Sequence, residues 1–169
     1  MDVETAIRTR RTHKAYGPEP VPRGVVEELL ALARWAPNHH LTEPWRFRVL
    51  GAETLERLIA AGEPSEAAKL RRAPTLVVAS SRRSGDPHAD REDVLATAAA
   101  VYVVLLAAHA RGLASYWRTP GILRTAKGRE AVGVGDGERI LGLLHLGAPE
   151  REPAPREREP VDAYVSFLD

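Results

Sequence analysis

The sequence predicts a single α+β domain spanning residues 1–169, and three observations support this. The chain has 169 residues, of which 44% are hydrophobic and 28% are charged, so it can bury one compact core. Several segments carry apolar residues at helical spacing, and a few short segments have the alternating or continuously apolar pattern of strands. Segments rich in glycine and proline separate them, as expected for turns and loops.

Helices are expected where apolar residues recur three or four positions apart. These segments are residues 2–10, 22–36, 53–61, 64–72 and 91–110. The first ends in arginines, a charge order that the helix dipole favours, and the second begins at Pro22, which suits a first helical turn. The last is apolar nearly all round, so it is expected in the core or at a subunit contact.

Strands are expected where the chain is short, extended and apolar. These segments are residues 45–50, 76–79, 113–117 and 140–147. Gly142 within the last strand is expected to allow a close backbone approach, and Gly112 is expected to cap the long helix. Residues 80–88 are expected to form a loop.

Composition and charge exclude several classes of function. Twenty-four basic and 23 acidic residues give a formal net charge of +1, so no global field attracts nucleic acid or an anionic membrane. The absence of cysteine excludes disulfides, thiolate nucleophiles and Cys-ligated metals. No signal-peptide pattern opens the chain, and no apolar run reaches about 18 residues. We therefore expect a soluble, cytoplasmic protein with neither a nucleic-acid nor a membrane partner.

The C-terminal region divides into two parts. Residues 150–160 are charged residues and prolines with little apolar content, so they cannot form a core and are expected to act as a tether. Residues 161–169 include Tyr164, Phe167 and Leu168. Apolar side chains at the end of a chain are buried only if the segment packs on another surface, so we expect it to bind a second subunit.

The first candidate site is the run from Arg10 to Lys14, which directly follows the first helix. Guanidinium groups match phosphate oxygens with two parallel hydrogen bonds, a threonine hydroxyl adds a neutral donor, and a lysine stabilises nearby negative charge. A solvated helix end is the alternative interpretation of this run alone.

Two further segments carry candidate residues. One is the loop that contains His39 and His40; neighbouring histidines point in different directions and no carboxylate completes a ligand set, so we expect no metal. The other is the segment from Gly112 to Pro120, where Trp117 is flat enough to pack on a cofactor ring. A plain loop and a core tryptophan are the alternatives.

Taken together and in order, these segments resemble the FMN-dependent nitroreductase family, in particular its small NAD(P)H nitroreductase-like members. Residues 10–16 are similar to that family's R-R/H-S/T-x-K/R-x-F/Y opening, and residues 33–47 are similar to its A-P-S-x-x-N-x-Q-P-W-x-F segment. Residues 112–119 and 146–149 resemble its later G-x-G/A-x-x-W and G-x-P elements. The resemblance covers nearly the whole chain through the order and spacing of these motifs.

The resemblance implies a fold and an assembly. The fold would have three layers, with a central, mainly antiparallel sheet flanked by helices. The protein would be a homodimer that binds FMN at the subunit interface, with the C-terminal segment extending onto the partner.

It also implies positions for the N-terminal site residues. Arg10 and Thr12, with Arg11 beside them, would contact the FMN phosphate and ribityl chain. Lys14 would lie near the pyrimidine edge of the flavin, where a cation stabilises the anionic reduced ring. His39 would contact the flavin from the other subunit.

At the far end of the cofactor, Trp117, Arg118 and Thr119 would line the flavin ring, and the Thr119 amide would donate to N5. Leu41 and Glu43 depart from the family's loop motif, in which Asn and Gln are usual, so one pyrimidine contact is expected to be missing. Arg156 and Arg158 are candidates for a further phosphate contact, with solvated tail residues as the alternative.

The implied activity is reduction of a nitroaromatic, a quinone or a related acceptor by NADH or NADPH, with ping-pong kinetics. No protein acid or base is expected to take part, so the catalytic chemistry would reside at the flavin N5. The alternatives are a flavin enzyme that uses oxygen, consumes flavin or dehalogenates, a non-catalytic flavin-binding dimer, and a helical interaction module without a cofactor.

Overall fold

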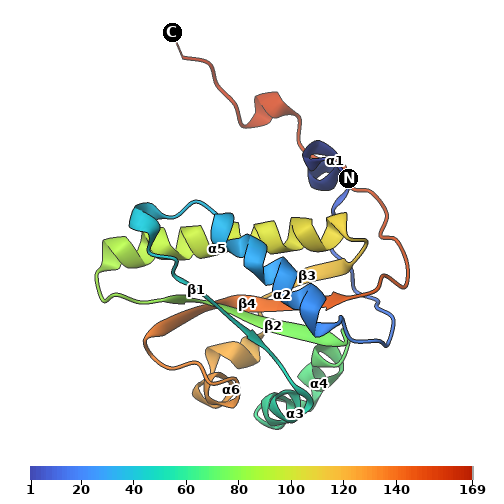
Figure 1. The fold of residues 1–169 in the computed structure, drawn as a ribbon, viewed down its shortest axis with the longest axis vertical. Helices are drawn as coiled ribbons and strands as arrows, with labels where there is room; N and C mark the ends of the chain where they lie inside the picture. The colour runs from blue at the N-terminus through green and yellow to red at the C-terminus, as the bar shows by residue number, and fades with distance from the viewer. Residues whose placement is uncertain (169) are drawn as a thin grey trace.

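The computed structural model describes residues 1–168 and contains one four-stranded sheet between two layers of helices (Figure 1). The strands are β1 (Trp45–Val49), β2 (Thr75–Arg82), β3 (Ala114–Arg118) and β4 (Glu138–Gly147). Their order is β1-β2-β4-β3, and all neighbouring pairs are antiparallel. The predicted α+β fold with a flanked antiparallel sheet is therefore confirmed. Asp169 lies outside the described residues.

The helices divide between the two faces of the sheet (Figure 1). On one face lie α2 (Arg23–Leu32) and α5 (Pro87–Ala110), and α1 (Val3–Thr9) packs against α5 on that side, farther from the strands. On the other face lie α3 (Ala52–Ala60), α4 (Pro64–Leu70) and α6 (Ala126–Ala131). Short 3₁₀ turns occur at Ala33–Trp35, His39–Leu41, Gly121–Arg124 and Val161–Ala163.

The central strands β2 and β4 are buried because both of their faces are covered. In β2, Val77 and Ala79 pack with α2 and α5, whereas Leu76 and Val78 pack with the layer of α3, α4 and α6. This two-sided packing explains the continuous apolar run that the sequence shows at this position.

The structure corrects the predicted loop at residues 80–88. Strand β2 continues through Ser80 and Ser81 to Arg82, and α5 already begins at Pro87, where the Asp86 side chain caps it. The two serines are fully buried although they are polar, because they lie in the ladder between β1 and β4. The sequence pattern also missed α6, which is too short to show periodicity.

Helix α5 is the one helix among residues 1–168 whose length and hydropathy would permit a membrane span. It lies against the sheet, and its buried side includes Val101, Val104 and Leu105 in the main core (Figure 1). On its other side, Leu95 is 57% exposed and Tyr102 is 40% exposed. The helix is thus a core helix that leaves an apolar outer face.

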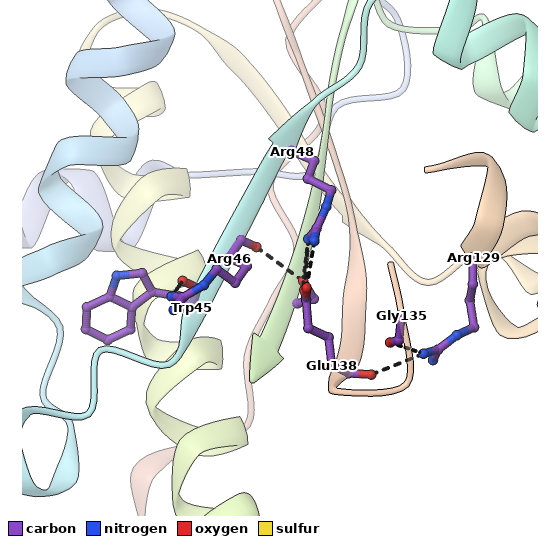
Figure 2. A network of polar contacts seen from close by, with 7 residues as sticks. Trp45, Arg46, Arg48, Arg129, Gly135 and Glu138 are labelled. Carbon is purple, nitrogen blue, oxygen red and sulfur yellow. Dashed lines mark hydrogen bonds and ion pairs between the residues drawn. The ribbon is translucent and has the colours of Figure 1, made fainter. Parts of the chain in front are cut away.

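A polar network joins the edge strand β1 to the central strand β4 across β2 (Figure 2). Arg48 on β1 donates two hydrogen bonds to the Glu138 carboxylate on β4, at 2.8 and 2.6 Å, and Ser80 donates to the same carboxylate. Arg129 donates to the carbonyl oxygens of Gly135 and Glu138, which holds the turn that enters β4. The Arg48 hydrogen bonds hold the pKa of Glu138 below its ordinary value of 4.5.

We predict that Glu138→Gln lowers the free energy of unfolding by about 1–2 kcal/mol at pH 7, because a half-buried guanidinium loses its charged partner. Since the folded-state pKa of Glu138 is depressed, the contribution of the pair is fully present above about pH 4.5 and is lost as the pH falls through the folded-state pKa. Urea unfolding of both proteins at pH 7 and pH 3 should therefore show a difference that shrinks in acid.

Glu56→Gln is the matched control, because Glu56 forms a similar bidentate pair with Arg71 that lies on the surface. We expect little change in its unfolding free energy. Equal losses of unfolding free energy in the two variants would show that the Arg48–Glu138 pair stabilises the fold no more than a surface pair does.

Candidate functional site

The run from Arg10 to Lys14 lies beside the beginning of β3. Thr12 forms a parallel bridge with Ser115, and the His13 amide donates to the Ser115 carbonyl at 3.1 Å. This extended pairing makes the side chains alternate, so that His13 is 4% exposed whereas Thr12 and Lys14 face the solvent. The structure therefore presents the predicted hydroxyl and ammonium groups on one side.

A pocket of about 800 Å³ opens over this run. Its lining comes from the start of the chain, from β3 and from the C-terminal tether: Arg10, Arg11, Thr12, Lys14, Ala15, Tyr116, Arg151, Glu152, Pro153, Ala154, Pro155, Arg156 and Arg158. Six of these residues are basic and one is acidic. We call it the N-terminal basic pocket, and its charge suits an anionic group such as a phosphate.

The basic side chains in this pocket differ in how far they are engaged. Arg11 donates to the carbonyl oxygens of Arg8 and Arg10, at 2.6 and 3.0 Å, so its guanidinium is partly used by the protein. Within residues 1–168, Arg10, Lys14 and Arg156 form no ion pair. The same holds for Arg151 and Arg158, so every basic residue of this pocket except Arg11 keeps its charge largely available to a ligand.

The predicted residues at the end of β3 are placed differently from one another. The Trp117 indole packs on the main core and donates to the Leu141 carbonyl at 3.1 Å. The Arg118 guanidinium points to α4 and pairs with Glu66 at 2.7 Å, with only 15% of its side chain exposed. Thr119 is exposed and lies in a separate pocket of about 500 Å³. The side chains of Trp117 and Arg118 thus support this end of the strand from inside the protein.

The edge strand β3 connects the two pockets. Its start pairs with the N-terminal basic pocket through Ser115, and its end leads directly to Thr119. A strand rises about 3.3 Å per residue, so these points are about 13 Å apart. Within residues 1–168, β3 has β4 on one side and only the short bridge at Thr12 on the other. Part of its backbone edge is therefore open to a ligand.

His39 lies far from this site within one chain. Its loop contacts the first part of α5, where the Thr42 hydroxyl donates to Asp93 at 2.6 Å. The N-terminal segment contacts the opposite end, where Thr9 and His109 are 2.7 Å apart. Since α5 rises about 1.5 Å per residue, these contacts are separated by about 24 Å along the helix. The structure does not bring His39 together with Arg10.

The His39 loop is held in an unusual conformation. His40, Leu41 and Glu43 all have positive φ angles, of 51°, 52° and 42°. The Asn38 side chain stabilises this path, because it accepts from the Glu43 amide at 2.9 Å and donates to the Ala36 carbonyl at 3.1 Å. Strained backbone of this kind concentrates at functional loops.

Sequence reasoning missed His145, which lies in β4 below the pocket. It is fully buried, and neither ring nitrogen has a hydrogen-bond partner among the described residues. Burial lowers its pKa to about 4, so the ring is neutral at pH 7. It packs against the rings of Tyr16 and Tyr116. A histidine inside an otherwise apolar strand was the only signal in the sequence.

Comparison with known proteins identifies the fold and the family. A model of the nitroreductase family matches residues 7–148. The Bacillus subtilis protein named "Putative NAD(P)H nitroreductase YfhC" is 29% identical over 92% of this chain and 88% of its own length. The crystal structure of a nitroreductase-like family protein from Bacillus cereus superposes with a TM-score of 0.91 over 100% of this chain and 97% of that one, at 24% identity.

A further structure, described as a "putative nitroreductase in complex with FMN" from Desulfovibrio desulfuricans, has a TM-score of 0.83 and 26% identity, and covers 99% of this chain and 96% of that one. The family match spans most of the chain and agrees with the order of motifs in the sequence. This chain belongs to the nitroreductase family, whose members are oxidoreductases.

Gly142 shapes the end of β3, and its substitution tests this geometry. A Cβ at Gly142 would lie 2.5 Å from the Arg118 carbonyl oxygen and 2.5 Å from the Trp117 indole nitrogen. We predict that Gly142→Ala lowers the free energy of unfolding by about 1–3 kcal/mol through overpacking. Thermal unfolding and tryptophan fluorescence would report the loss and the displaced indole.

Gly24→Ala is the control, because a Cβ there meets no atom within 4 Å and the residue lies inside α2. Alanine favours a helix more than glycine does, so this variant should be as stable as the wild type or more so. An unchanged Gly142→Ala protein would show that β3 and β4 can separate without cost.

Proposed function

We propose that this chain binds FMN along the open edge of β3 and transfers reducing equivalents from NADH or NADPH to a nitroaromatic, a quinone or a related acceptor. The observation that carries the proposal is the N-terminal basic pocket, which gathers six basic side chains at one end of the strand in a protein of net charge +1. Its chemistry fits the phosphate of the cofactor. The FMN bound to the Desulfovibrio desulfuricans relative supports the same assignment.

The phosphate end is assigned to side chains from both ends of the chain. Arg10 and Thr12 supply a guanidinium and a hydroxyl, and Arg156 brings a second guanidinium from the tether into the same pocket. The tether at residues 150–160 thereby acquires a role beyond linkage. Arg11 contributes mainly charge, because its guanidinium already donates to two backbone carbonyls.

The ring end is assigned to Lys14 and to the segment that follows β3. Lys14 is exposed on the same side as Thr12, where its ammonium stabilises negative charge on the pyrimidine edge. The Thr119 amide, at the other end of the strand, would donate to N5 of the bound flavin. Trp117 and Arg118 hold this backbone in place through their bonds to Leu141 and Glu66.

When bound, FMN supplies the hydride chemistry at N5, and the protein contributes orientation, charge and exclusion of water. No acidic side chain lies at the ring end of β3 in the described residues, apart from Glu66, which is paired with Arg118. Donor and acceptor use the same space in turn. Initial-rate plots at several acceptor concentrations should therefore give the parallel lines of a ping-pong mechanism.

The active unit in this proposal is a homodimer. One flavin cannot contact both Arg10 and His39 of one chain, because these residues lie at opposite ends of α5. A second copy placed on the outer face of α5 would bring its His39 loop to the flavin. That face carries the exposed side chains Leu95 and Tyr102, and the C-terminal segment adds Phe167, which is 96% exposed.

We predict that Arg10→Ala weakens FMN binding by about tenfold to a hundredfold, because a charge-assisted hydrogen bond to the phosphate is lost. Visible absorption after incubation with FMN and desalting measures retained flavin, and anaerobic NADH then tests reduction. Arg57→Ala is the control, since Arg57 lies on α3 and bonds only to Thr54 of the same helix.

Flavin retention and bleaching by NADH distinguish the proposed reductase from the alternatives. Flavin that is retained by the wild type and bleached by NADH supports the reductase. Flavin that is retained without bleaching by NADH or NADPH would favour a non-catalytic or oxygen-using flavoprotein. A wild-type protein that retains no flavin would contradict the proposal.

For the dimer, we predict that Tyr102→Asp shifts the sedimenting species from twice the 18.5 kDa chain mass to the mass of a single chain. A charge would have to be buried without a partner at the interface. Val49→Asp is the control, because Val49 is 50% exposed at the β1 edge, away from α5. Dimers that persist in Tyr102→Asp would place the interface elsewhere.

A further inference from the structure

A second basic pocket lies at the beginning of α5. It has a volume of about 810 Å³ and is formed where β2 ends, α5 begins and β4 starts. Its lining residues are Arg82, Arg83, Ser84, Gly85, Pro87, Asp90, Arg91, Val94, Leu95, Asp136, Gly137 and Arg139. We call it the second basic pocket. It shares no residue with the N-terminal basic pocket.

The arginines of this pocket are available to a ligand. Arg82, Arg83, Arg91 and Arg139 are all exposed, and none of the four is in an ion pair within residues 1–168.

The two acids of the second basic pocket are already engaged with other groups. Asp90 accepts from the Ser84 amide and hydroxyl, at 2.6 and 2.9 Å, and Asp136 is 3.6 Å from Arg129. None of the four guanidinium groups forms an ion pair in the described part of the chain, although the charge of Asp90 acts on Arg83. Four arginines against two carboxylates leave the lining with an excess of positive charge.

The walls of the pocket are fixed by backbone contacts. The Arg83 amide donates to the Gly137 carbonyl at 2.8 Å, and the Arg82 amide donates to the Pro44 carbonyl at 2.9 Å. Arg139 follows Glu138, which the network with Arg48 anchors (Figure 2). The backbone positions from which Arg82, Arg83 and Arg139 project are thus fixed, and no backbone ordering is needed when they bind an anion.

The second basic pocket adjoins the ring end of the proposed flavin site. The pocket that contains Thr119 and Pro120 also contains Val94 and Arg139, and these two residues line the second basic pocket as well. A molecule that lies at Thr119 and passes Val94 and Arg139 would reach the arginines of the second basic pocket. A nicotinamide dinucleotide has the required shape, with its reactive ring at one end and its phosphates at the other.

We propose that the second basic pocket binds the 2′-phosphate of NADPH and makes this protein prefer NADPH to NADH. The two donors differ only in that phosphate ester, which carries up to two negative charges, and guanidinium groups bind such a group with paired hydrogen bonds. The inference rests on the proposed function, because it places the nicotinamide beside the flavin at Thr119. It goes further by naming the donor and the residues that select it.

The test compares the wild type with Arg83→Gln, Arg91→Gln and the double variant, all loaded with FMN. The kcat/KM for NADPH should fall by about tenfold more than the kcat/KM for NADH in each single variant, because one charge-assisted contact to the phosphate is lost. Arg57→Gln is the control for loss of a surface arginine and should keep the ratio of the wild type. Flavin absorbance should be retained in every variant.

A binding measurement separates this inference from the proposed function. Titration of the FMN-loaded proteins with adenosine 2′,5′-bisphosphate, in a calorimeter, reports the pocket without any turnover. The wild type should bind it more tightly than 5′-AMP, and the double variant should lose the difference. If the protein retained no flavin, the proposed function would fail. The same titration of the flavin-free protein would still decide whether the second basic pocket binds the phosphate. Arg156→Ala, a variant of the N-terminal basic pocket, would serve as its control.

Three outcomes would overturn the inference. The first is equal kcat/KM for NADPH and NADH in the wild type, and the second is an equal loss for both donors in the arginine variants. The third is an unchanged preference between NADPH and NADH in the variants, together with a lower kcat/KM for 4-nitrobenzoate relative to nitrobenzene as the acceptor. That result would assign the arginines to an anionic acceptor instead.

Discussion

The pairing of the Arg10–Lys14 run with the start of β3 is the constraint on which the site depends. Because the run is extended along an edge strand, its side chains alternate, and burial of His13 on one side forces Thr12 and Lys14 to the other. One short piece of backbone pairing therefore converts a row of basic residues into an ordered pocket.

The other end of β3 is held from the inside. Trp117 bonds to β4, Arg118 bonds to α4, and the absence of a side chain at Gly142 lets β4 pass close to both. These contacts give both side chains a supporting role: the Arg118 guanidinium pairs with Glu66, and the exposed position in this segment is Thr119.

Charge is balanced over the whole chain yet segregated in space. The net charge of +1 excludes a general attraction to anions, whereas two separate pockets each collect several arginines. Helix α5 separates the His39 loop from the N-terminal basic pocket, and its exposed apolar face gives the proposed second copy a surface to bury. Local charge and an uncovered helix face together favour a small anionic cofactor shared between two chains.

The sequence by itself determined the fold class, the four strands, the long core helix and the family, because each depends on local periodicity or on the order of short motifs. It also marked Arg10, Thr12 and Lys14, which the structure gathers in one pocket. Only the tertiary structure decided that Arg156 joins them, that Arg118 faces α4, that His39 lies at the far end of α5, and that Arg83 and Arg139 share a second pocket. These facts depend on contacts between residues distant in the chain. Local sequence patterns do not specify such contacts, even where they mark a residue such as Arg156 as a candidate.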